Sequence, residues 1–167
     1  MSAQRAGSYS ARPRNDFRRA PTRARVGLAM RRSMDFGPLG DVEPLIQNQG
    51  LSLAPMSTGD ASLSVAGVTV LATARGADIA SGALKGLVVP GGMTDDASMA
   101  AVKLLLDAAG AKGVPILAFG DGIEQAVLAA GGDPTAFVDA PAVLIHGTQI
   151  TSLADRDAVA AAAAAIG

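Results

Sequence analysis

The sequence predicts an α/β fold, a three-layer sandwich in which a mostly parallel sheet has helices on both faces. From residue 23 onward, short apolar runs alternate with helical patterns, and this is the order of βαβ units. The short runs are apolar throughout rather than alternating, as in strands that are buried on both faces. Aromatic residues make up only 3% of the chain, so the core between the layers must consist of Ala, Val, Leu and Ile.

The expected elements of the first half follow in chain order. Val26–Met30 predicts a strand, and Leu39–Gln49 predicts a helix that Gly50 ends, since glycine is the common residue just past a helix. Leu51–Pro55 predicts the next strand. Residues 65–71 predict either two short strands around a turn or one bulged strand.

The second half continues the alternation. Thr94 resembles an N-cap, and Asp95 and Asp96 follow in the first turn, where the helix dipole favours anions. Ser152 and Asp155 resemble a capping box for a last helix. The other expected strands are Gly86–Val89, Pro115–Phe119, Ala142–Ile145 and Gln149–Thr151, and the other expected helices are Ala97–Ala109 and Ile123–Ala130.

A binding site is expected at one edge of this sheet. In parallel sheets, ligands bind beyond the carboxyl ends of the strands. Three loops should meet at that edge, namely Arg31–Pro38, Pro90–Thr94 and Gly120–Ile123.

The composition excludes several classes of protein. The chain has no Cys, which rules out disulfides, thiolate metal sites and cysteine nucleophiles. No run of 18 uncharged apolar residues predicts a membrane span, and the polar N-terminus does not resemble a secretory signal. We therefore expect a soluble, cytoplasmic protein that needs no metal or cofactor.

Charge is distributed unevenly along the chain. Residues 1–32 hold nine Arg and one acid, a net charge of +8, whereas the remainder holds five basic and 14 acidic residues, a net charge of −9. Residues 1–22 have only Tyr9 and Phe17 as large apolar groups, so we expect a disordered basic tail followed by one domain over residues 23–167.

Three roles for the basic tail remain open. It can contact nucleic acid or another polyanion, it can contact a protein partner or an acidic surface of its own assembly, or it can have no specific role. A transit peptide is a further alternative, which Asp16 disfavours. The arginines expected to contact a polyanion or partner are Arg12, Arg14, Arg18, Arg19, Arg23 and Arg25.

Three segments together resemble one family. Residues 86–92 (GLVVPGG), 115–122 (PILAFGDG) and 149–152 (QITS) are similar, in order and spacing, to motifs of the ThiJ/PfpI (class I glutamine amidotransferase-like) superfamily. The resemblance covers residues 24–167 and implies a flavodoxin/glutamine amidotransferase-like fold, and because the family usually dimerises, it also implies a homo-oligomer.

The family resemblance places a nucleophile at Gly120, where this chain has none. In the family a Cys occupies this sharp strand-to-helix turn, the nucleophile elbow, and small neighbours such as Ala118 and Gly122 let it project. A glycine side chain cannot attack a substrate. Asp121, one residue beyond the elbow, is expected to stabilise the start of the following helix rather than to act as a nucleophile.

The partners of the nucleophile are missing as well. An ungapped alignment puts Pro38 at the position of the family's acidic residue and leaves Asp35 three residues out of register. His146 is the only His and is expected to have a structural or surface role, and Glu124 is expected on a solvated helix face. The C-terminal domain of large-subunit catalases has a similar fold and also lacks the nucleophile, and residues 118–125 resemble that type.

The glycines of these motifs predict a vestigial anion cradle, because their backbone amides lie near helix N-termini. These residues are Gly91, Gly92, Gly120 and Gly122. Acidic residues nearby disfavour a strongly anionic ligand. We thus expect a catalytically inactive binding, regulatory or scaffold subunit, a pseudoenzyme whose tail contacts a partner or polyanion; the alternative is a hydrolase, amidotransferase or glyoxalase-like enzyme with displaced catalytic residues around Asp121.

Overall fold

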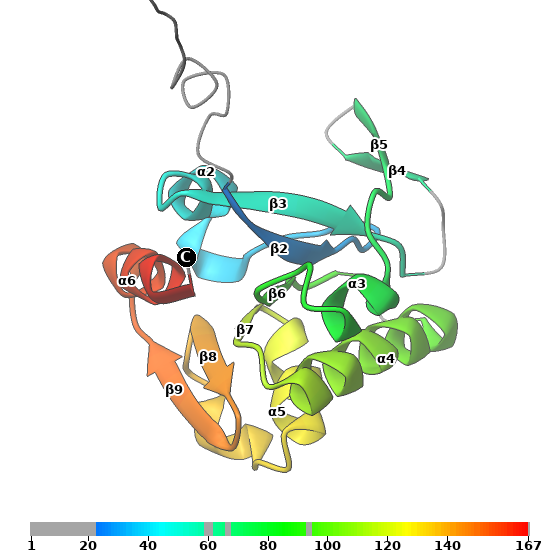
Figure 1. The fold of residues 1–167 in the computed structure, drawn as a ribbon. Coiled ribbons are helices and arrows are strands. Elements are labelled where there is room, and N and C mark those ends of the chain that lie inside the picture. The colour runs from blue at the N-terminus through cyan, green and yellow to red at the C-terminus, as the bar shows by residue number, and fades with distance from the viewer. Residues whose placement is uncertain (1–22, 59–61, 66–67, 93–94, 167) are drawn as a thin grey trace, which may run out of the picture.

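A six-stranded sheet forms the centre of the computed structural model, which describes residues 23–58, 62–65, 68–92 and 95–166. Its strands are β2 (Ala24–Ala29), β3 (Leu51–Met56), β6 (Leu87–Val89), β7 (Ile116–Phe119), β8 (Ala142–His146) and β9 (Gln149–Leu153). The strand order is β3-β2-β6-β7-β8-β9 (Figure 1). The first four strands are parallel to one another. Strand β8 is antiparallel to β7, and β9 turns back antiparallel to β8 and so runs in the direction of the first four, which confirms the prediction of a mostly parallel sheet.

Helices cover both faces of the sheet, as predicted. Helices α3 (Gly76–Ala80), α4 (Asp96–Lys112) and α5 (Gly122–Ala129) lie on one face, and α2 (Glu43–Gln47) and α6 (Arg156–Ile166) lie on the other (Figure 1). Successive residues of a strand point to opposite faces. Leu87 and Val89 accordingly pack in the core beneath α3, α4 and α5, while Val88 packs in the core beneath α2 and α6.

The helix predicted over Leu39–Gln49 is broken into two pieces. A 3-10 turn, η1 (Gly37–Leu39), is followed by the single-turn helix α2. Gly40 has φ +74°, outside the helical region, and Pro44 fits only in the first turn of a helix because it has no backbone N–H. The prediction of a helix was therefore wrong over residues 40–42. Gly40 and Pro44 interrupt the helix, although the spacing of the apolar residues continues across them.

Two predicted helix caps are replaced by neighbouring aspartates. The side chain of Asp95 accepts a hydrogen bond from the Ser98 amide at 2.9 Å at the start of α4, and Thr94 lies outside the described residues. The side chain of Asp155 accepts from the Ala158 amide at 2.8 Å at the start of α6. Ser152 is part of β9, so the predicted capping box does not form.

The remaining elements are small. Strands β4 (Ser62–Val65) and β5 (Val68–Leu71) form a separate antiparallel pair; there are two strands, as one of the alternatives had it, but β4 lies before the predicted segment and shares only Val65 with it. The short helix α3 and the 3-10 turn η2 (Pro134–Phe137) were not predicted. The predicted disordered tail over residues 1–22 lies outside the described residues. Across the described ranges, no helix has the length and apolar character to cross a membrane.

Candidate functional site

A sharp turn at Gly120 joins β7 to α5 at the carboxyl edge of the sheet. Gly120 has φ +53°, a left-handed conformation that glycine adopts at no steric cost. A Cβ atom at this position would lie 3.3 Å from Asp35 Oδ1 and 3.5 Å from Gly91 Cα. The turn therefore has the shape of a nucleophile elbow that points into the junction of the three loops, and no side chain occupies it.

Asp35 is the acidic residue at the elbow, which corrects the alignment that put Pro38 there. Its backbone pairs with that of Gly91 through hydrogen bonds of 2.9 and 3.1 Å, and its Oδ1 accepts from the Gly37 amide at 2.8 Å. Ser33, with φ +52°, turns the chain between β2 and this bridge. Because of that turn and bridge, Asp35 rather than Pro38 lies beside Gly120, and Pro38 lies in η1.

An aromatic contact holds the Asp35 loop against β7. The rings of Phe36 and Phe119 meet edge to face, with centroids 5.2 Å apart, and both side chains are buried. Such a contact between aromatic rings is favourable beyond the area that it buries. It fixes the loop immediately beside Asp35 to the strand that leads into Gly120.

The motif glycines allow the loops to approach one another closely. A Cβ atom on Gly122 would lie 2.8 Å from the carbonyl oxygens of Val89 and Pro90, and one on Gly92 would lie 2.8 Å from Arg31 Cβ. The Gly91 amide donates to the Asp35 carbonyl oxygen at 2.9 Å, so that amide is already engaged. A ligand-binding role for Gly91, Gly92, Gly120 and Gly122 stays a prediction.

A buried arginine lies at the centre of this junction. The Arg31 side chain is 1% exposed, and its Nη1 donates to the Pro90 carbonyl oxygen at 3.3 Å. Burial lowers the pKa of Arg31, while the carboxylates of Asp121, Asp95 and Asp35 act in the opposite direction. The guanidinium group therefore lies close enough to acidic residues of two of these loops and of the α4 N-cap for their charges to favour its ionised form.

Sequence reasoning missed Arg31 because it counted this residue with the basic N-terminal segment. A signal was present in the sequence. Arg31 directly follows a buried strand. Asp35 and Asp121 lie in two of the loops expected at this edge, and Asp95 directly follows the third. A cation at the end of an apolar strand, facing three acids, is typical of an internal charge cluster rather than of a solvated tail.

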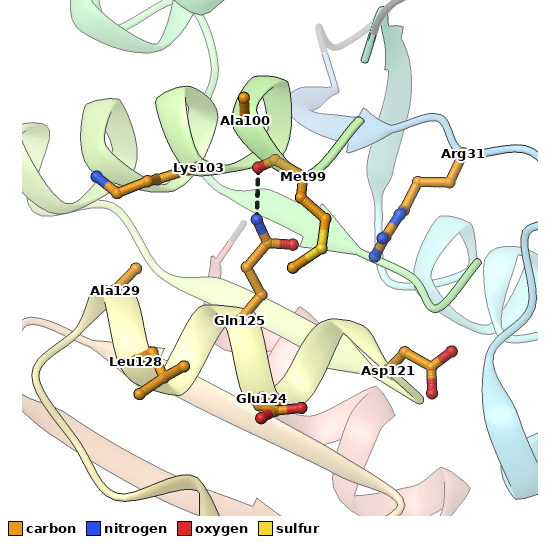
Figure 2. A pocket seen from close by; sticks show the side chains of 9 residues that line it. All are labelled: Arg31, Met99, Ala100, Lys103, Asp121, Glu124, Gln125, Leu128 and Ala129. Atoms are coloured by element: carbon orange, nitrogen blue, oxygen red, sulfur yellow. Dashed lines mark hydrogen bonds between the residues drawn. The ribbon is translucent and has the colours of Figure 1, made fainter. Parts of the chain in front are cut away.

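A cleft of about 750 Å³ opens beside the elbow, between α4 and α5. Figure 2 shows Arg31 and Asp121 near one end and Lys103 at the other. A second cavity of about 300 Å³ lies on the other side of the first turn of α5 and shares Asp121 and Glu124 with the cleft. The full lining of the larger cleft is Arg31, Met99, Ala100, Lys103, Asp121, Glu124, Gln125, Leu128 and Ala129.

Asp121 and Glu124 occupy the ridge between the two cavities. Both are exposed, which for Glu124 fits the expected solvated face. Asp121 is the N-cap residue of α5 but makes no side-chain capping hydrogen bond, so its expected role at the helix start is limited to electrostatics. In the described part of the chain, no group of three or more His, Asp or Glu residues is arranged to hold a metal ion.

Other predicted residues lie away from this site. His146 is exposed at the end of β8, and because β8 is antiparallel to β7, it lies at the sheet edge opposite Gly120. Arg23 donates to the carbonyl oxygens of Gln47 and Leu51, and Arg25 is exposed. Arg12, Arg14, Arg18 and Arg19 fall outside the described residues.

Solved structures show where this architecture recurs. No family model and no curated protein sequence matches the chain. The oxidized DJ-1 of Toxoplasma gondii is similar with a TM-score of 0.52 and 17% identity, over 86% of each chain. The DJ-1beta of Drosophila melanogaster has a TM-score of 0.52 and 15% identity, over 85% of this chain and 87% of that one.

A bacterial protein shows the same similarity. The candidate protease I of Bacteroides thetaiotaomicron has a TM-score of 0.51 and 13% identity, over 81% of this chain and 92% of that one. At these identities the comparison establishes the fold and leaves activity open. The chain thus has the α/β fold of the DJ-1 and ThiJ/PfpI proteins, which its sequence motifs predicted.

Proposed function

We propose that this protein is a non-catalytic binding, regulatory or scaffold subunit built on the DJ-1/ThiJ/PfpI fold. The observation that supports this most directly is Gly120. The turn at this residue retains the elbow conformation and faces an acidic residue, Asp35, but it has no side chain that can form a covalent intermediate. Nucleophilic catalysis requires an activated side chain at such a turn.

The charge distribution disfavours acyl transfer and so supports a role in binding. Arg31 is buried, donates to the Pro90 carbonyl oxygen and has three carboxylates nearby, so the proposal gives this cation the role of holding loops together rather than of binding a free anion. The exposed carboxylates beside the cleft add negative charge. A substrate oxyanion would meet this negative charge, whereas acyl transfer needs hydrogen-bond donors aimed at the developing oxyanion.

The proposed role of the basic N-terminal segment is contact with a partner or polyanion. Its net charge, opposite in sign to that of the rest of the chain, supports either an external polyanion or an acidic surface on a second copy. Nucleic-acid binding driven by arginines falls steeply with salt. A salt titration with a single-stranded oligonucleotide, using the full chain and a deletion of residues 1–22, distinguishes an external polyanion from self-association.

One observation favours the alternative of an enzyme with displaced residues. The Asp35 carboxylate lies beside the position that a nucleophile would occupy, so a general base is present at the elbow. A water molecule activated by Asp35 or Asp121 would then have to replace the nucleophile. This alternative predicts activity that depends on these carboxylates.

An activity comparison tests the proposal. The wild-type protein, Asp35→Asn and Asp121→Asn are assayed with an activated ester, with glutamine and with methylglyoxal. We expect rates equal to those of the buffer for all three proteins. Turnover by the wild type that either substitution abolishes would contradict the proposal and establish the enzyme.

A further inference from the structure

Exposed apolar residues gather on the face of the molecule that α4 and α5 form. Five large hydrophobic side chains of the described chain are exposed, and three of them, Met99, Leu104 and Leu128, lie on these two helices. Met99 and Leu128 line the cleft between the helices. Exposed apolar residues that gather on one face, rather than being scattered singly, are typical of a protein–protein contact.

Leu104 lies beside the cleft and is not among the residues that line it. Ala100, which does line the cleft, lies four residues before Leu104 on α4, so the two share one side of the helix. The Leu104 side chain is 70% exposed, and burying it would be favourable. A projecting leucine and an apolar cleft of about 750 Å³ are therefore neighbours on one surface, and the leucine of one copy can enter the cleft of another.

Charges of opposite sign lie at the two ends of the cleft. Figure 2 shows Lys103 at one end and Asp121 near the other, and Glu124 in the first turn of α5 adds a second exposed carboxylate. A two-fold axis through the middle of the cleft places each end of one copy against the opposite end of the other. Lys103 of each copy then faces carboxylates of its partner, so the charges of this face are complementary to themselves.

The contact that Lys103 makes within its own chain is compatible with this pairing. Its Nζ lies 2.8 Å from Asp107 Oδ2, one turn along α4, and both side chains are exposed. An exposed pair of this kind contributes little to stability. The ammonium group has three donors, so it can keep this contact and also meet a carboxylate of a second copy.

We propose that the α4–α5 face is the contact surface of a symmetric homodimer, in which Leu104 of each copy occupies the α4–α5 cleft of the other. Leu104 lies against Met99 and Leu128 there, and Lys103 pairs with the acidic end of the partner's cleft. An apolar centre between charged ends is the usual composition of a protein–protein interface. This inference goes beyond the proposed function and holds whether or not the elbow at Gly120 is inactive.

A single charge at Leu104 tests the central contact. Sedimentation equilibrium of the full-length protein should show a dimer at micromolar concentration. Leu104→Glu should raise the dimer Kd about a hundredfold, because it removes a central apolar contact and places a charge in an apolar cleft. Leu71→Glu is the matched control, since Leu71 lies on β5 and is 64% exposed, and it should leave the Kd unchanged. A monomeric wild type, or equal Kd values for the two variants, would overturn the proposal.

Charge reversal tests the relative orientation of the two copies. Lys103→Glu and Glu124→Lys should each raise the Kd about fivefold to tenfold, since each exposed ion pair contributes modestly but occurs twice in the dimer. The double variant Lys103→Glu/Glu124→Lys restores opposite charges across the two-fold axis and should recover the wild-type Kd. Losses that add in the double variant would refute this arrangement.

Self-association through the basic N-terminal segment gives a different pattern. If residues 1–22 of one copy held an acidic surface of another, deleting them would abolish the dimer, and the added acid of Leu104→Glu would leave the Kd unchanged or lower it. We expect the deletion to leave the Kd unchanged and Leu104→Glu to raise it. The opposite pair of results would assign the dimer to the N-terminal segment and overturn the proposal.

Discussion

The Oδ1 atom of Asp35 lies 3.3 Å from the point at which a Cβ atom of Gly120 would stand. The two residues are far apart in sequence, and the loop that carries Asp35 reaches the elbow only because it pairs with Gly91. This contact defines the candidate site: an acidic group beside a left-handed turn that carries no side chain.

We expect Gly120→Cys to fold with a lower unfolding free energy. A residue other than glycine in the left-handed region costs about 1–2 kcal/mol, and its Cβ atom would also press on Asp35. Gly131→Cys is the control, since Gly131 has φ +82° and open space around it. Urea unfolding should show a larger loss for Gly120→Cys, and the excess should disappear when Asp35 is also replaced by Ala. Equal losses of unfolding free energy in Gly120→Cys and Gly131→Cys would show that contact with Asp35 does not contribute to the loss.

Gly122→Ala should destabilise the protein strongly. Its methyl group would lie 2.8 Å from two carbonyl oxygens of the β6 end, and backbone atoms cannot move aside as side chains do, so the loss should reach about 3 kcal/mol. Gly110→Ala, in the last turn of α4 with nothing within 4 Å, should instead stabilise by about 0.5–1 kcal/mol. Thermal unfolding of the two variants checks the opposite signs.

Arg31→Met is expected to lower the unfolding free energy by about 1–3 kcal/mol, because it leaves the Pro90 carbonyl oxygen without its buried donor and removes a cation near three carboxylates. Adding Asp95→Asn should restore part of this loss, as Asn still caps α4 while removing one charge. The exposed Arg25 provides the control Arg25→Met, with a change within about 0.5 kcal/mol. Equal effects of the Arg31 and Arg25 substitutions would contradict the central place of Arg31.

Stability should depend on Glu43 at mildly acidic pH. Burial, and secondarily the charge of Asp41, raises the pKa of Glu43. The folded state then holds the proton to a higher pH than the unfolded state, so this group lowers the unfolding free energy as pH rises above the unfolded pKa of about 4.3.

Glu43→Gln removes that dependence. The variant should be more stable than the wild type at pH 7 and equally stable near pH 3, where both states of the wild type are protonated. Urea unfolding at several pH values measures the difference. A variant that is less stable than the wild type at pH 7 would show that the ionised Glu43 stabilises the fold.

The sequence patterns predicted the strands of the main sheet well because the signals are local. Buried strands such as β6 and β7 are continuous apolar runs that end at glycine or proline. The break in the helix over Leu39–Gln49 went unseen because the apolar spacing continues across Gly40. The short helix α3 has too few residues for a periodic signal to develop.

The candidate site was predicted in its location but only partly in its residues. The three loops do meet at the carboxyl edge, as the strand pattern required. Asp35 was placed out of register because its position depends on the turn at Ser33 and on pairing with Gly91, which are non-local. Arg31 and the cleft depend on how α4 and α5 pack against these loops, and no single segment of sequence encodes that arrangement.

Gly120 also bears on how this chain relates to reactive proteins of similar shape. A residue with a side chain would be strained at such a turn, and that strain is part of what makes an elbow nucleophile reactive. With glycine the same backbone is relaxed. The relaxed backbone should therefore stabilise this chain relative to one with a side chain at the same turn. If the proposed non-catalytic role holds, one position sets both properties, and Gly120→Cys measures how much stability a thiol at this turn costs.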